Sequence, residues 1–205
     1  EAKPHDYARA VADGALLALI ASLGLLQLGH ETTPELLQLT GSTLFLFSLA
    51  AVQRKPLQAR LASLIALPIL AASGSPAVAG MLGLAGMVVC WRSSKAHMKT
   101  HLPWVLSATL LALGLASVLS ATGLSGWAWR IDSDFSLKEN LQLVSWFTWP
   151  TLPLAVLTTW HWRRQIWRRH IAVPLLTAAV GFAASIAMGA NERALLAALP
   201  PLAVL

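Results

Sequence analysis

The stretch LASLIALPILAASGSPAVAGMLGLAGMVVCW, residues 61–91, decides how this chain is expected to fold. It contains no Asp, Glu, Lys or Arg, yet it is longer than the roughly 20 apolar residues that cross a hydrocarbon core once. Ser73, Gly74, Ser75 and Pro76 interrupt it, and Gly and Pro break helices. We therefore expect a short hairpin or re-entrant pair of apolar segments, 61–72 and 77–91.

Apolar runs of the same kind fill most of the remaining sequence. The chain is 56% hydrophobic and 12% charged, with a mean hydropathy of +0.63, whereas soluble domains are about 25% charged. The sequence predicts an all-α, polytopic transmembrane helical bundle with about seven or eight membrane segments. Besides the broken pair at 61–91, these are 11–29, 36–52, 104–127, 141–160, 171–189 and an eighth that begins near Ala194.

The ends of the chain bear on its domain organisation. It begins at Glu1 without Met, lacks the pattern of a signal peptide, and stops at Leu205 within an apolar run. We expect residues 1–205 to form a single transmembrane domain of a longer membrane protein. The lone cysteine, Cys90, excludes a disulfide within the chain.

The net charge of +6 is concentrated in three short links, 53–60, 92–103 and 161–170, which contain no acidic residue. If 61–91 turns back on itself, all three links lie on one face, and the positive-inside rule makes that face cytoplasmic. This pattern favours a membrane protein and excludes nucleic acid as the partner. Six acidic residues fall on the opposite face: Glu31, Glu35, Asp132, Asp134, Glu139 and Glu192.

Aromatic and small residues agree with this interpretation. Six of the nine tryptophans stand at expected segment ends, where the indole N–H can stay in the headgroup region. The run HWRRQIWRRH, residues 161–170, is expected to lie against anionic lipid headgroups. Gly80, Gly83 and Gly86 recur three residues apart and form a smooth stripe, for which close helix packing is the expected role.

The polar stretch GHETTPELL, residues 29–37, precedes the second predicted segment. Thr32 and Glu35 have the spacing of a capping box, and Pro34 suits the first turn, so a helix is expected to begin here. That role accounts for Glu35 but leaves His30 and Glu31, at the same non-cytoplasmic boundary, unexplained.

Two further polar groups bear on a metal site. Asp132 and Asp134 form a D-x-D pair that could hold a hard cation, but the pattern is only three residues long, so we expect a solvated loop. The histidines of the basic links are too scattered in sequence to predict a metal site. They are His97, His101, His161 and His170.

Three stretches in this order resemble the membrane region of GT-C glycosyltransferases, specifically the group of protein O-mannosyltransferases and aminoarabinose transferases (glycosyltransferase family 39). GHETTPELLQLTG, 29–41, is similar to a boundary where the family has Thr-Asp in place of Pro34 and Glu35. Residues 61–91 are similar to two apolar runs separated by Thr-Lys-Gly-Pro. SIAMGANERALLAALPPLAVL, 185–205, is similar to a helix end followed by a basic residue, here Arg193.

The resemblance implies a transferase that takes a sugar from a polyprenyl phosphate and hands it to an acceptor on the non-cytoplasmic face of the bacterial inner membrane. It implies Glu35 and Glu31 as acidic catalytic residues, Arg193 as the group that binds the donor phosphate, and His30 with Glu31 as ligands of a possible divalent metal. The family's first extracytoplasmic loop, which carries further acidic residues, would precede Glu1.

A second class of function fits the same residues: a non-catalytic integral membrane subunit or lipid-handling scaffold that works with other membrane subunits. No predicted span carries an acid or base near its middle. Because ionisable groups at mid-membrane usually mark proton pathways, this distribution argues against a proton-coupled transporter.

Overall fold

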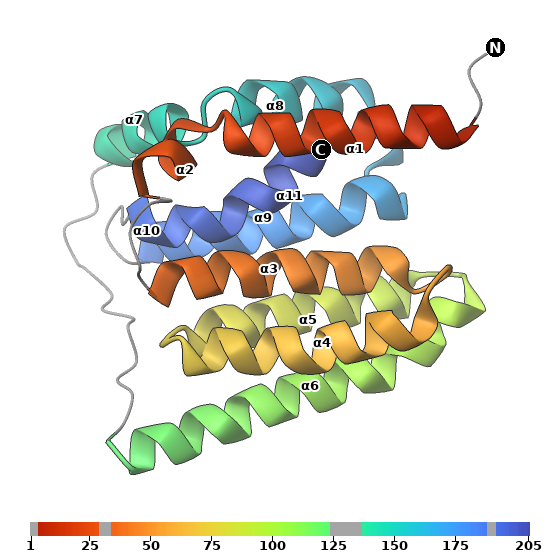
Figure 1. Ribbon diagram of the computed structural model, residues 1–205, viewed down its shortest axis with the longest axis vertical. Coiled ribbons are helices and arrows are strands. Elements are labelled where there is room, and N and C mark those ends of the chain that lie inside the picture. Colours follow the sequence, from red (N-terminus) through yellow and green to blue (C-terminus); the bar gives the residue numbers. More distant parts are fainter. Residues whose placement is uncertain (1–3, 29–33, 124–136, 188–191) are drawn as a thin grey trace.

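The computed structural model describes residues 4–28, 34–123, 137–187 and 192–205, and this part of the chain is all-helical, with no strand. The helices lie side by side in layers, with α1, α7 and α8 on one side, α3 and α9 in the middle and α6 on the far side (Figure 1). In chain order they are α1 (Pro4–Ile20), α2 (Leu23–Leu28), α3 (Pro34–Ala51), α4 (Pro56–Ala72), α5 (Pro76–Arg92), α6 (Ala96–Ala121), α7 (Leu137–Phe147), α8 (Thr151–His161), α9 (Arg169–Ala187), α10 (Glu192–Leu195) and α11 (Leu199–Val204).

The hairpin expected at 61–91 is present as α4 and α5. Gly74 has a φ of 89° in the turn, a left-handed conformation that glycine adopts without steric cost. Pro76 occupies the first turn of α5, where its missing N–H leaves no helical hydrogen bond unmade. The Gln38 side-chain amide donates to the Ser73 carbonyl oxygen at 3.3 Å, so the turn is joined to the first half of α3.

The glycine stripe of α5 packs closely at two of its three positions. A Cβ at Gly83 would overlap the Thr109 side chain of α6, and one at Gly86 would lie 2.6 Å from Cζ of Phe45 on α3. At Gly80 the nearest side-chain atom, from Leu113, would be 3.7 Å away, an ordinary contact. Close packing therefore holds for Gly83 and Gly86 but not for Gly80.

Three predicted segments are divided in the structure. The chain from 11 to 29 is divided between α1 and α2, and 141–160 is divided between α7 and α8. Pro150 has no N–H to continue a helix, which accounts for the second break. The two breaks meet, since the Leu23 N–H donates to the Trp149 carbonyl oxygen at 3.1 Å. The eighth segment is likewise divided, into α10, a 3-10 turn at Leu196–Ala198, and α11.

Two helices, α6 and α9, are long and apolar enough to cross a membrane, and α4 and α5 are shorter apolar helices. Only 28% of the most apolar stretch of α6 is buried, against 56% for α9. Leucines 106, 110, 111 and 113 of α6 are exposed. A core helix of a soluble protein buries such side chains, so α6 supports association with a membrane.

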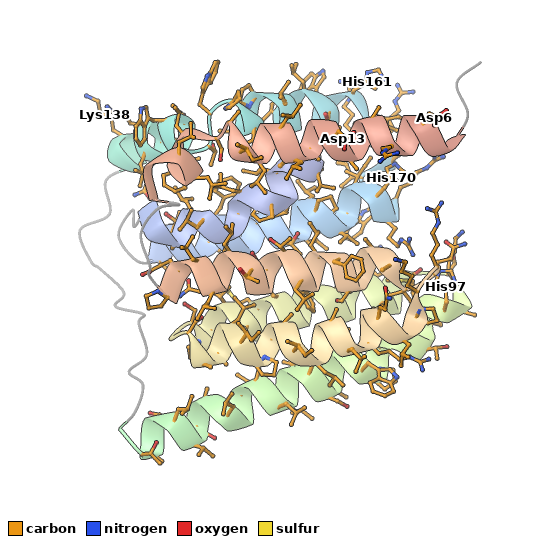
Figure 2. The ribbon with its side chains drawn as sticks, viewed as in Figure 1. Asp6, Asp13, His97, Lys138, His161 and His170 are labelled. Carbon is orange, nitrogen blue, oxygen red and sulfur yellow. The ribbon has the colours of Figure 1, made fainter. Side chains whose placement is uncertain are left out.

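The basic links lie at one end of the bundle, as the charge pattern predicted. Side chains from all three surround one pocket, described below. Figure 2 shows His97, His161 and His170 near this end and Lys138 at the opposite end. It also shows Asp6 of α1 near the basic end, so the separation of charges is less complete than the sequence suggested.

Candidate functional site

Glu35 lies in the first turn of α3, which begins at Pro34 as predicted. Its side chain is half-buried, and its Oε2 atom is withdrawn from solvent without a hydrogen-bond partner in the described part of the chain. The positive end of the helix dipole favours a carboxylate at this position. Because native structures usually pair such atoms, an unpaired carboxylate oxygen is free to accept a proton or a donor from a ligand.

The other residues of the predicted site are placed less fully. His30, Glu31, Asp132 and Asp134 lie outside the described residues, as does Thr32 of the expected capping box. Arg193 belongs to α10, which lies at the same end of the bundle as the start of α3 (Figure 1). The backbone thus brings the Glu35 and Arg193 positions to one end, opposite the basic links.

No metal centre emerges from the described ranges, which contain no group of three His, Cys, Asp or Glu side chains that could hold an ion. The predicted ligands His30 and Glu31 fall in the stretch between α2 and α3, outside those ranges. The metal therefore stays a prediction.

The basic end contains a pocket of about 740 Å³, here called the basic pocket. It lies between the α5–α6 turn and the start of α9, and its lining includes Gln53 in the link between α3 and α4. Five of its lining residues are basic and none is acidic. The basic residues are Arg92, Lys95, Arg168, Arg169 and His170.

Two side-chain interactions hold the walls of the basic pocket together. The Arg169 guanidinium donates to the Ala50 carbonyl oxygen at 3.2 Å and to the Met98 sulfur at 3.6 Å, which joins α9 to α3 and α6. Arg92 lies over the indole of Trp167, with its Cζ 4.3 Å from the ring centroid, within the range of a cation–π contact. The residues in each of these contacts are far apart in the sequence, so neither contact could be predicted from it.

The histidines judged too scattered in sequence form two pairs in space. His97 and His101 line a pocket of about 120 Å³ together with Arg60, and the Nε2 atoms of both are buried without a hydrogen-bond partner among the described residues. Their spacing of four on a helix was the signal that could have predicted this. His161 and His170 both meet the ring of Trp162 edge to face, at 5.8 and 5.9 Å.

An apolar groove of about 430 Å³ runs between α8, α9 and α11. Trp160 and Arg163 contribute to its lining, and the Arg163 Cζ lies 4.9 Å from the Trp160 ring centroid. The other lining side chains are almost all apolar; they include Leu152, Val156, Leu175, Phe182, Leu202 and Leu205. A groove of this kind suits a hydrocarbon chain with a polar or anionic head.

Comparisons with protein-family models, with curated proteins and with solved structures gave no match to this chain. The resemblance to family 39 glycosyltransferases therefore rests on the quoted stretches alone.

Proposed function

We propose that the chain is the membrane-embedded part of a glycosyltransferase, folded as a bundle of about seven or eight membrane segments. The exposed leucines of α6 support the membrane setting, because apolar side chains on the outside of a helix are stable in lipid and costly in water. The basic links would face the cytoplasm of a bacterial inner membrane, and the start of α3 would face the other side.

Glu35 carries the proposed activity. Its half-buried carboxylate has an oxygen without a partner among the residues that the structure describes, at the end of the bundle where an acceptor would arrive. In the proposed reaction this carboxylate, assisted by Glu31, takes the proton of the acceptor hydroxyl while the acceptor oxygen bonds to the anomeric carbon. The bond between that carbon and the phosphate oxygen of the polyprenyl donor breaks, and Arg193 binds the departing phosphate.

The test is sugar transfer by the full-length protein, with the variant Glu35→Gln. We expect transfer to fall to background, because an amide has the shape of the carboxylate but does not take up the proton. Asp13→Asn on α1 is the matched control, since Asp13 is exposed and lies on a different helix from Glu35. Full transfer by Glu35→Gln would leave that residue only a role in starting α3.

The apolar groove favours a second candidate, a lipid-handling subunit without catalytic activity. Ala179 lines the groove from α9 and is exposed, so Ala179→Trp should fill it. Loss of co-purified lipid in this variant, with no transferase activity in the parent protein, would support the second candidate. Ala183→Trp is the matched control, because Ala183 is also exposed on α9 but does not line the groove.

A further inference from the structure

We propose that the basic pocket is a binding site for the phosphate of an anionic phosphate ester. This site is separate from the proposed transfer site. The pocket is lined by the α5–α6 turn and the start of α9, whereas Glu35 is in the first turn of α3, and these segments lie at opposite ends of the bundle (Figure 1). It is also more than a run of basic sequence, because its walls come from three links that are far apart in the chain.

The positive charge of the pocket favours binding of an anion. Four permanently cationic side chains and His170 line it, and no acidic side chain in the described ranges shares that lining. Asp6 lies near the same end (Figure 2), but it is not a lining residue. Like charges gathered without a counter-charge repel one another, so binding a phosphate there relieves repulsion as well as forming new bonds.

The arginines of the pocket supply the donors that suit a phosphate. Arg92 meets the Trp167 ring in a cation–π contact, which does not use its N–H groups on an oxygen acceptor, so they can make a bidentate contact with two phosphate oxygens. Arg169 has five N–H groups and uses two of them for Ala50 and Met98, so further donors remain. α9, a helix of 19 residues, begins at this pocket, and its dipole adds to the attraction.

The size of the pocket and the residues around it limit which ligands can bind. A volume of about 740 Å³ accommodates a phosphate together with the polar part of an ester, and lies within the range of small-molecule sites. Two largely exposed tryptophans lie beside the lining residue Arg92. Trp91 precedes it in the sequence, and Trp167 contacts its guanidinium. Exposed indoles are typical of the membrane–water interface, so an anionic lipid headgroup and a free phosphate compound are the two sources to separate.

The experiment measures binding by calorimetry to the full-length protein in an uncharged detergent. The probes are inorganic phosphate, pyrophosphate, short-chain phosphatidylglycerol and, as the zwitterionic comparison, short-chain phosphatidylcholine. We expect Arg168→Gln and Lys95→Gln each to weaken binding of the anionic probe about tenfold, as for the loss of one charge-assisted hydrogen bond. Both side chains are exposed, so neither substitution disturbs the core, and circular dichroism verifies the helices.

Arg54→Gln is the matched control. Arg54 is an exposed arginine of the neighbouring link, its loss changes the net charge equally, and it does not line the pocket. Binding of phosphatidylglycerol without pyrophosphate would identify a lipid headgroup as the ligand, and binding of both would identify a phosphate group from either source. Equal weakening by Arg54→Gln, or no anion bound more tightly than phosphatidylcholine, would overturn the proposal. Glu35→Gln should bind as the parent does, which keeps this test independent of the transferase.

Discussion

The guanidinium of Arg92 lies over the indole of Trp167, with Cζ 4.3 Å from the ring centroid. Arg92 is the last residue of α5, and Trp167 belongs to the stretch that leads into α9. The contact therefore joins two links that are remote in sequence, and both residues line the basic pocket. It orients an arginine that would otherwise be free to move in solvent.

Trp167→Leu should weaken binding of an anionic ligand about two- to fivefold, because an exposed cation–π contact contributes about 0.5–1 kcal/mol. The charge of the pocket is unchanged, so the loss reports the indole of Trp167, both as the partner of Arg92 and as a lining side chain. Titration calorimetry with the anionic probe that binds the parent protein measures this loss of affinity. Trp146→Leu, an exposed tryptophan of α7 outside the pocket, should bind as the parent protein does.

Gly83→Ala should lower the free energy of unfolding by about 1–3 kcal/mol, since the added methyl group overlaps Thr109 and forces α5 and α6 apart. Gly80→Ala adds the same methyl group where the nearest side-chain atom is 3.7 Å away. That variant should be neutral or slightly more stable, because alanine favours a helix over glycine. Unfolding in detergent compares the two, and equal destabilisation would argue against close packing at Gly83.

Arg169→Lys should destabilise the protein by about 1–2 kcal/mol, although it preserves the charge. Lysine lacks the planar fork that reaches both the Ala50 carbonyl oxygen and the Met98 sulfur. Arg164→Lys makes the same change at an exposed arginine and should have almost no effect. Thermal unfolding of the two variants, followed by circular dichroism, provides the comparison.

The proposed orientation predicts which ends of the helices react with a thiol reagent that does not cross membranes. Lys138→Cys should be labelled in intact cells, and Lys55→Cys only after the membrane is opened, because the two exposed positions belong to opposite ends of the bundle. The native Cys90 is buried and should contribute little background. Labelling of Lys55→Cys in intact cells would show that the protein has the opposite orientation in the membrane.

Some features of the fold could be predicted because local residues specify them. Pro34 marks the start of α3, and Gly74 with Pro76 marks the turn between α4 and α5. The start of α6 is different: it begins at Ala96 although hydropathy placed the segment at 104–127. Hydropathy locates the apolar part of a helix, and a helix continues through polar residues such as Lys99 without difficulty.

The site divides in the same way. The gathering of the basic links at one end followed from the hairpin, because α4 and α5 together carry the chain to the other end of the bundle and back. The partners within that end did not follow, since the pairing of Arg92 with Trp167, or of Arg169 with Ala50, depends on how the helices pack. Pro150 could have predicted the break between α7 and α8. Apolar residues on both sides of it led instead to the prediction of one segment, 141–160.

The contacts of Arg169 have a consequence for the order in which the protein assembles. Helices α3 to α6 pack on one another, so they can associate while the ribosome is still translating the remainder of the chain. Arg169 reaches the ends of that early assembly at Ala50 and Met98 only after the later helices have been inserted. A chain that stops before α9 would present Arg92 and Lys95 to solvent without the other side of the basic pocket, so the anion site would form only in the finished molecule.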